Sequence, residues 1–248
     1  MKKIVYSVIS VILLFLGSAC EKDDNEIKGT ANITVINAAI GNGAIRVNPG
    51  LGGGFSYAKA SDIAYGTSAG VGAFTGTNNI TVVKTTDTTN ILFQRSIALQ
   101  PISTLYISGQ APAIDTMYRV ESNFPYIQAS KLDADNSVYI RFVNLSPNSA
   151  PLNVNIRSSV TNEVSGLAYK GITAFKKYDA PTTAASYIFE VRDAATNIVI
   201  FTYTLPLATF RYKTLSIVIG GLVPVLPITN PAPPASATPV IVFPVSYT

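Results

Sequence analysis

Residues 33–37 read Ile-Thr-Val-Ile-Asn, and residues 140–144 read Ile-Arg-Phe-Val-Asn. In both stretches apolar, polar and apolar residues alternate ahead of the Asn, as expected of a strand that buries one face. Gly, Pro, Asn, Asp and Thr recur between such short apolar runs along the chain, whereas helical spacing is scarcely visible. The two stretches therefore predict a protein built from strands, in which one β-domain occurs twice.

The match between the two stretches continues, in the same order, along most of the 248-residue chain. Its further pairs are 63–65 with 167–169, 70–74 with 171–175, 91–93 with 199–201 and 104–107 with 214–217, at offsets of about 101 to 110 residues. A preserved order indicates an internal duplication. We therefore expect an all-β fold with two tandem antiparallel β-sandwich (immunoglobulin-like) domains of about seven short strands each.

Changes in composition along the chain suggest where its parts begin and end. We expect a signal peptide at 1–19, a polar acidic tether at 20–30, a first sandwich at 31–121, a linker at 122–136 and a second sandwich at 137–248. Within the last part, a Pro-rich segment at 223–239 precedes an apolar run at 240–245. This run is expected to return and pair with the second sandwich, where Pro244 would confine it to an edge strand.

The N-terminus has the pattern of a secretory leader. Lys2 and Lys3 precede a mostly apolar run at 4–16, and the small residues 17–19 follow it. The run is shorter than the ~20 residues that a membrane-spanning helix needs, which makes a transmembrane anchor the weaker interpretation.

The sole cysteine, Cys20, comes directly after the small residues and resembles the lipobox of bacterial lipoproteins. That resemblance implies cleavage before Cys20 and acylation of its thiol and new amine with chains such as palmitate. One departure is Gly17, where the lipobox has an aliphatic residue, with Leu16 one place early. The alternative is a plain signal peptide followed by a bystander cysteine. Two or three acyl chains would make membrane attachment effectively permanent.

Residues 21–26 read Glu-Lys-Asp-Asp-Asn-Glu, a solvated spacer without apolar periodicity. This segment also resembles the acidic export signal that follows the lipid-bearing Cys in surface lipoproteins of the Bacteroidota. We therefore expect a lipid-anchored outer-membrane protein on the cell surface, with the periplasmic face as the alternative.

Composition excludes several classes of chemistry. Apolar residues make up 48% of the chain and charged residues 13%, so the chain is expected to fold rather than remain disordered. It contains no His and no Trp, so no Ser-His-Asp or Cys-His catalytic arrangement can form, and the commonest zinc ligands are missing. The formal charge of +4 includes Lys2 and Lys3 of the leader, and the remaining basic residues do not cluster. We expect no enzyme activity, no cofactor, no metal site and no nucleic-acid partner.

Three short motifs suggest chemistry that their context does not support. Residues 56–59, Ser-Tyr-Ala-Lys, fit the Ser-x-x-Lys of penicillin-recognising enzymes, loosely echoed at 84–86, but that motif needs the start of a buried helix. Residues 50–54 are Gly-rich, yet lack the Lys-Ser/Thr and the helix of a phosphate loop, and favour a hairpin tip. Residues 133–137 begin like a calcium loop, but Val138 stands where the loop needs Gly and no Glu closes it; a capped turn is the default.

Four further residues are candidate sites. Tyr65 and Tyr169 occupy equivalent places in the two copies, where they either plug the cores or face a ligand. Thr88 and Thr116 follow Asp residues and resemble the Asp-Ser/Thr-x sites at which Bacteroidota attach O-glycans.

The whole layout resembles the family of Bacteroidota lipoproteins catalogued as domain of unknown function four-three-nine-seven. The likeness covers residues 31–222 and lies in the strand-ending Asn37 and Asn144 and in the Ala-Tyr pairs that end at Tyr65 and Tyr169. After the second Asn the chain reads Leu-Ser-Pro (145–147), whereas in the first copy the Ser-Pro is replaced by Ala38-Ala39. The resemblance implies a β-sandwich envelope lipoprotein and no assigned activity.

These expectations combine into one functional hypothesis and its rivals. We expect a non-catalytic envelope lipoprotein that acts as a structural or binding module, with an extracellular glycan or protein as the candidate partner. The alternative is a glycan-capture lipoprotein of a polysaccharide-uptake system, which would need a groove lined by exposed Tyr or Phe and by amides. A hydrolase is a third and weaker interpretation, because it would need a cleft with perturbed carboxylates.

Overall fold

The computed structural model describes residues 28–51, 54–126, 135–224 and 239–247. Its first domain contains seven strands: β1 (Thr30–Asn37), β2 (Ile45–Asn48), β3 (Thr67–Phe74), β4 (Gly76–Lys84), β5 (Ile91–Leu99), β6 (Ile102–Gln110) and β7 (Ala113–Val120). Its second domain contains eight: β8 (Ser137–Asn144), β9 (Leu152–Ile156), β10 (Asn162–Leu167), β11 (Lys176–Asp179), β12 (Ser186–Asp193), β13 (Val199–Pro206), β14 (Thr214–Gly220) and β15 (Ile241–Ser246). The all-β prediction is confirmed.

Apart from the 3₁₀ residue Gly54, helical structure in the described part of the chain consists of two short turns. These are the 3₁₀ turn η2 (Tyr57–Lys59) and the α-helical turn α2 (Leu207–Phe210). Across the described ranges, no helix has both the length and the apolar character needed to span a bilayer.

Each domain is a sandwich of two sheets with the same strand order. Domain 1 pairs the sheet β3-β1-β6-β7 with the sheet β2-β4-β5, and domain 2 pairs β11-β8-β14-β15 with β10-β9-β12-β13. In domain 2, Leu167 of β10 pairs with Leu152 of β9. At the equivalent place in domain 1, an isolated bridge joins Ile45 and Ile63 instead. Domain 1 therefore has the same plan with one strand fewer.

The sandwiches differ from the expected arrangement in two respects. The pairs β1–β6 and β8–β14 are parallel, so neither sandwich is purely antiparallel. The strand order also differs from that of an immunoglobulin domain, in which strands one, two, five and four share a sheet. The likeness to immunoglobulin domains is therefore one of layers and not of connectivity.

The strand registers define which residues of the two domains correspond. Phe93 and Phe201 lie opposite Val82 and Val191, each beside an identical bulge, in agreement with the sequence match. The predicted match of 104–107 with 214–217 is out of register by two residues. Val35 and Phe142 are equivalent, and they lie opposite Leu105 and Ile217, so Leu105 corresponds to Ile217. A shift of two preserves the inward and outward alternation, so the sequence pattern could not detect it.

A second match is displaced as well. Ser68 pairs with Ile36 and Ile172 bridges to Val143, so Ser68, rather than Val71, corresponds to Ile172. The run 70–74 therefore does not correspond to 171–175.

The C-terminal run behaves as expected. Strand β15 pairs antiparallel with β14 and forms the edge of its sheet. Pro244 lies opposite Ile217 on this edge strand, where a missing backbone N–H is tolerated.

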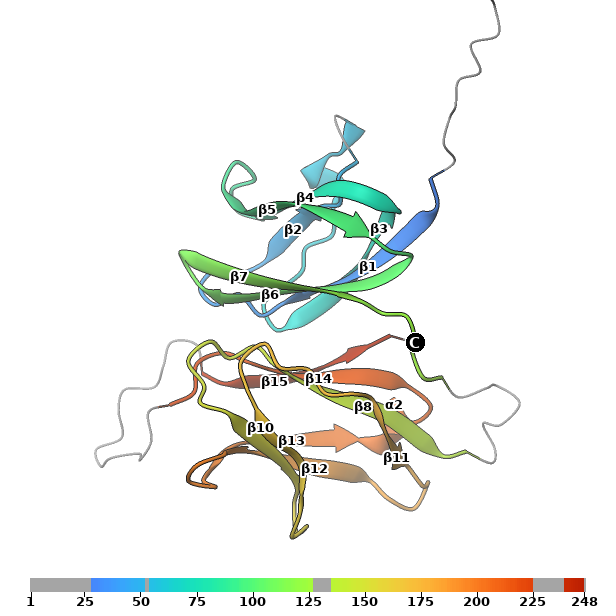
Figure 1. Cartoon of the computed structure of the whole chain (residues 1–248), viewed down its shortest axis with the longest axis vertical. Coiled ribbons are helices and arrows are strands. Elements are labelled where there is room, and N and C mark those ends of the chain that lie inside the picture. Colours follow the sequence, from blue (N-terminus) through green and yellow to red (C-terminus); the bar gives the residue numbers. More distant parts are fainter. Residues whose placement is uncertain (1–27, 52–53, 127–134, 225–238, 248) are drawn as a thin grey trace, which may run out of the picture.

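The two sandwiches stack to give four layers of sheet (Figure 1). Each domain has its own apolar core, one around Ile33 and Leu105 and the other around Phe142 and Phe189. A third apolar cluster lies between the inner sheets and contains buried residues of both domains: Ile36, Ala38, Tyr106, Val143, Leu145, Val218, Phe243 and Val245. The outward face of each inner sheet is thus buried by the other domain.

Candidate functional site

The repeated Asn organises the equivalent turn in each domain. Asn37 Nδ2 donates to the carbonyl oxygens of Gly43 and Ile63, both at 2.9 Å, and Asn144 Nδ2 donates to the Leu167 carbonyl oxygen at 3.1 Å. In both domains the Asn Oδ1 also accepts the backbone N–H two residues on. Because both Asn residues are buried, these bonds fix the Ala-Tyr segment against the end of the first strand.

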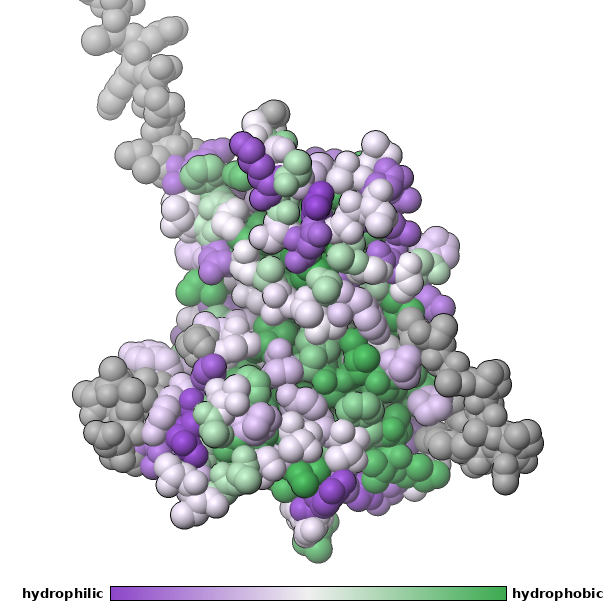
Figure 2. Space-filling model, turned by 180° about the vertical axis from the view of Figure 1, so that it is seen from behind, coloured by the Kyte–Doolittle hydropathy of each residue, from purple (hydrophilic) through white to green (hydrophobic). Residues whose placement is uncertain are grey.

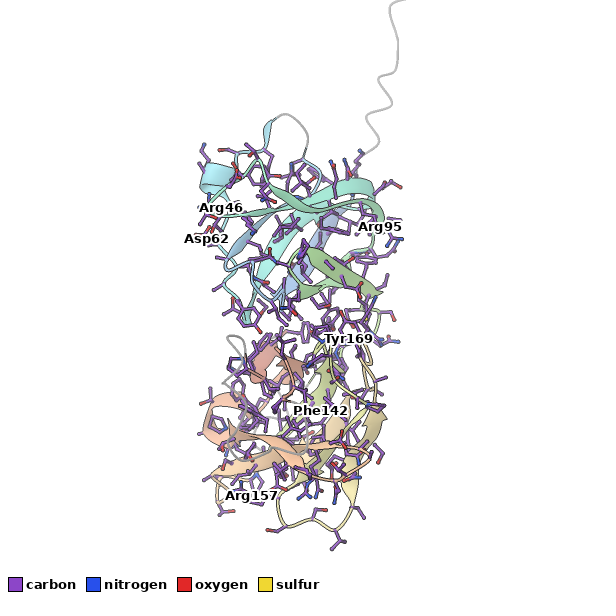
Figure 3. All side chains as sticks on the ribbon, turned by 90° about the vertical axis from the view of Figure 1, so that its left-hand side faces the viewer. Arg46, Asp62, Arg95, Phe142, Arg157 and Tyr169 are labelled. Atoms are coloured by element: carbon purple, nitrogen blue, oxygen red, sulfur yellow. The ribbon has the colours of Figure 1, made fainter. Side chains whose placement is uncertain are left out.

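Tyr169 projects from this turn onto domain 1 and lies at the junction of the domains (Figure 3). Its hydroxyl is 2.9 Å from Ser108 Oγ and donates to Asp115 Oδ2 at 3.2 Å. Lys170 Nζ donates to Asp115 Oδ1 at 2.9 Å. Burial alone would raise the pKa of Asp115, but the bonds from Lys170, the Thr116 N–H and Tyr169 outweigh it and lower that pKa. Tyr169 is therefore an interdomain contact and not a core plug.

Tyr65 has a different environment from its counterpart. Its hydroxyl is buried and has no hydrogen-bond partner among the described residues, and burial raises its pKa. The neighbouring Gly66 lies against Ile241 of domain 2: a Cβ on Gly66 would be 3.1 Å from Ile241 Cδ1. The structure therefore places both predicted tyrosines at or beside the domain junction, but only Tyr169 has polar partners across it.

The contacts of these two turns are reciprocal. Gly66 and Lys170 correspond, because each backbone N–H donates to the carbonyl oxygen of the strand-ending Asn. Their partners, Ile241 and Asp115, also correspond, since they lie opposite Gly220 and Ser108 in equivalent hairpins. Each domain thus uses equivalent positions to contact the other, which is the pattern of an isologous interface.

A groove of about 630 Å³ opens between the domains beside Tyr169. Its walls come from the β6–β7 hairpin of domain 1 and from three loops of domain 2: Gly109, Gln110, Ala111, Ala113, Ile114, Asp115, Pro147, Asn148, Tyr169 and Leu222. The lining combines apolar surface with one tyrosine, two amides and one carboxylate. Pockets at domain interfaces with this mixture are common ligand sites.

Sequence reasoning missed the strongest polar feature of the interface, a buried ion pair that joins the domains. Arg141 of β8 has a side chain only 1% exposed, and the side chain of Glu121, just after β7, is 5% exposed. Arg141 Nη1 donates to Glu121 Oε2 at 2.9 Å and Nη2 donates to Oε1 at 2.6 Å. This two-bond geometry is the strong form of an Arg–carboxylate contact.

Arg141 has further polar partners besides Glu121. Its Nε donates to Ser216 Oγ at 2.7 Å, and Nη2 reaches the hydroxyls of Tyr106 and Tyr247 at 2.9 and 2.8 Å. The ring of Phe175 lies 4.5 Å from the guanidinium carbon. Burial alone would lower the pKa of Arg141, but its polar partners outweigh this effect and raise it, so the charge is retained.

Only one signal in the sequence pointed to this cluster. Arg141 interrupts an apolar strand between Ile140 and Phe142, a pattern that predicts a residue on a solvated face. In the structure, domain 1 buries that face. The alternation of residues along a single strand cannot predict that another domain packs against it.

The other candidate positions are not brought together. Thr88 lies in the turn between β4 and β5, and Thr116 lies in β7; both are partly exposed and stay predictions as glycosylation sites. Ser56 precedes the turn η2, which has no buried residue, so the buried helix that a Ser-x-x-Lys site requires is absent there. Asp135 pairs with Lys177 at 2.8 Å. Cys20, residues 52–53 of the Gly-rich segment, Asp133 and most of the Pro-rich segment lie outside the described residues.

Comparisons with known proteins add no family assignment. No protein-family model and no curated protein matches the sequence. Over the ranges that the structure describes, no group of three or more Cys, Asp or Glu residues is placed to hold a metal ion.

Proposed function

We propose that the chain is a lipid-anchored, non-catalytic lipoprotein of the bacterial cell envelope that presents a binding module to the outside. Two observations support the two halves of the proposal. Cys20, placed directly after an apolar leader, supports the anchor. The groove between two firmly joined domains supports the binding module, because it is preformed and combines apolar and polar groups.

The arrangement of the domains fits presentation away from a membrane. The start of β1 lies near the end of domain 1 that faces away from domain 2 (Figure 1). With a lipid at Cys20, domain 1 would lie nearer the membrane and domain 2 farther out. On the face shown in Figure 2, exposed apolar side chains gather mainly over domain 2, whereas domain 1 is more polar. A distal apolar surface is suited to contact with another macromolecule.

The likeness to the family catalogued as domain of unknown function four-three-nine-seven is part of this proposal. It rests on the tandem sandwiches and on the repeated Asn and Tyr positions.

The anchor is tested in native cells by mass spectrometry of the mature N-terminus and by protease treatment of intact cells. We expect acyl chains on Cys20, their loss in Cys20→Ser, and digestion of the protein without lysis. A bare thiol in the native protein would refute the anchor, and complete protection from protease would refute surface exposure.

A second candidate function is glycan capture for a polysaccharide-uptake system. The groove favours it in one respect, since Tyr169 lies there with the amides of Gln110 and Asn148. Binding of the Cys20→Ser chain to an array of neutral polysaccharides tests it. Gln110→Ala should weaken binding several-fold, and Gln94→Ala, an exposed amide on β5, should not. Absence of binding to every glycan would exclude this function and leave a protein partner or a spacer.

A further inference from the structure

A second groove runs along the free side of domain 1, away from the interdomain groove. Its volume is about 410 Å³, and it lies between β5 and β7, the edge strands of the two sheets of the sandwich. Its lining residues are Phe93, Arg95, Ser96, Ile97, Ala98, Leu105, Thr116 and Tyr118. Tyr118 accepts the Gln100 N–H at 3.2 Å and donates to the Ala98 carbonyl at 3.3 Å, which closes one end.

Arg95 occupies a position in this groove that normally carries an apolar side chain. It lies opposite Ile80 of β4, and Ile80 is fully buried in the core of domain 1. Its neighbours on the same face, Phe93 and Ile97, pack against that core. The side chain of Arg95 is nevertheless exposed, and it makes no hydrogen bond or ion pair with any residue in the described ranges. Figure 3 shows it on the opposite side of domain 1 from the ion pair Arg46–Asp62.

In domain 2 the equivalent place is filled by side chains of the domain itself. The residue equivalent to Arg95 is Tyr203, which lies opposite Phe189 and packs against the core. The residue equivalent to Ile97 is Leu205, which is fully buried, and Phe210 of α2 packs against the same core. Domain 1 lacks this turn and keeps a cation in place of the aromatic ring. The open groove is therefore a specific difference between two copies of one domain.

We propose that this groove binds an extended peptide segment of a partner protein, which adds to the free edge of β5 as a further strand. Alternate side chains of an added strand would face inward beside Phe93, Arg95 and Ile97. Complementarity then requires an apolar residue, an acidic residue and a second apolar residue at alternate positions of the peptide. The acidic side chain would pair with the exposed, unpartnered guanidinium, which sets the charge preference of the groove, while the apolar residues supply contact area.

A second copy of this chain is a poor occupant. Two β5 strands pairing about Arg95 would place like charges opposite each other, which is destabilising. A charged residue on an edge strand can also serve only to prevent such pairing. That simpler role predicts no affinity for any peptide, so binding measurements distinguish the two explanations.

The test uses the full chain carrying Cys20→Ser and a fluorescent nine-residue peptide with the core Val-Thr-Asp-Thr-Val. We expect saturable binding by fluorescence anisotropy, and affinity at least about tenfold weaker for a peptide with Lys in place of Asp. Arg95→Glu should reverse this preference. Lys59→Glu, the same charge change on the exposed turn η2 of domain 1, should leave it unchanged.

Hydrogen exchange supplies the second readout. The backbone amides of β5 that face away from β4 should exchange more slowly when the peptide is bound, because an added strand pairs with this free edge. The proposal would be overturned if neither the Asp peptide nor the Lys peptide binds. It would also be overturned if the Asp peptide binds equally well to the Cys20→Ser chain with and without Arg95→Glu. Charge-dependent binding without slower exchange in β5 would overturn the strand addition.

Discussion

Arg141 carries five N–H donors, and burying this cation is costly unless a counter-charge and hydrogen-bond acceptors compensate. Glu121, Ser216 and two tyrosine hydroxyls supply acceptors to all three of its nitrogens, from both domains. The acceptors come from strands far apart in the sequence, so the arrangement is complete only when the domains are docked. The Arg141–Glu121 pair therefore favours one arrangement of the two domains, because any other arrangement would leave a buried charge unpaired.

Removal of one partner should therefore be costly. We expect Glu121→Gln to lower the free energy of unfolding by about 3–5 kcal/mol, because the guanidinium stays buried without its counter-charge. Urea denaturation measures the change. Asp62→Asn, which removes a partner from the exposed pair Arg46–Asp62, should cost less than about 1 kcal/mol.

The double variant Glu121→Leu with Arg141→Met checks the cause. It should recover most of the stability lost in Glu121→Gln, because no unpaired charge remains in the interface. Equal losses in the single and double variants would show that packing, and not charge, dominates at this position.

Asp115 gives the interface a pH dependence of known sign. Its pKa is below the ordinary 3.8 in the folded chain, so its contribution is complete at neutral pH. The contribution declines as the pH falls to the unfolded value and is lost below the lowered folded value. Lys170→Met should raise the pKa of Asp115, as followed by carboxyl chemical shifts in an NMR titration. An unchanged pKa would show that Lys170 Nζ does not pair with Asp115 in solution.

Individual residues also show what can be predicted from the sequence and what cannot. Asn37 and Asn144 were found because both domains need the same buried amide at the same turn, so the identity survives duplication. Arg141 was not found, because the equivalent residue in domain 1 is the uncharged Thr34. The repeat therefore gives no sign that a charge matters at this position. Contacts within a domain are repeated in the sequence, whereas contacts between the domains are made by residues that differ between the copies.

At the scale of elements, the hairpin β6–β7 shows why a glycine lies next to the end of the central strand β6. Gly109 has φ of +84°, and its equivalent, Gly221, has φ of +79°. A Cβ at Gly109 would lie 2.5 Å from the Ala113 carbonyl oxygen and 2.9 Å from the Asp115 nitrogen. The hairpin also forms one wall of the interdomain groove, so this glycine positions the candidate site.

Gly109→Ala should thus destabilise the protein by about 1–3 kcal/mol, through backbone strain and through steric overlap with the opposite strand. Gly72→Ala is the matched control, since a Cβ on this β3 residue has nothing within 4 Å and its backbone needs no left-handed conformation. That control should be neutral or slightly stabilising. Thermal unfolding followed by circular dichroism compares the two, and equal melting temperatures would contradict the strain.

The elements themselves were largely predictable from alternation and turn residues, but their registers were not. The bulged hairpins at Phe93 and Phe201 matched because both copies keep the same aromatic beside the same bulge. The β6 and β14 match was two residues out of register, because a strand moved by two keeps the same face buried. Parallel pairing of β1 with β6 also left no local signal, since it depends on how the chain returns and not on the composition of the strand.

At the scale of the whole molecule, the cluster between the inner sheets joins two cores that could otherwise be independent. Val143 and Ile36 are both fully buried in this cluster and belong to neither domain core. The reciprocal contacts at the two edges of the interface indicate an arrangement like that of a dimer of identical domains, now covalently linked. We therefore expect the chain to unfold as one cooperative unit, although its strand connectivity would allow two.

Differential scanning calorimetry of the Cys20→Ser chain should show a single transition, with equal calorimetric and van't Hoff enthalpies. Val143→Asp should split it in two, because a carboxylate buried between the inner sheets separates the domains without entering either core. Val199→Asp, on an exposed position of β13, should leave one transition. Two transitions in the Cys20→Ser chain would mean that the interface is weaker than its burial and its Arg141–Glu121 pair indicate. The groove beside Tyr169 would then open and close with the motion of the domains instead of being preformed.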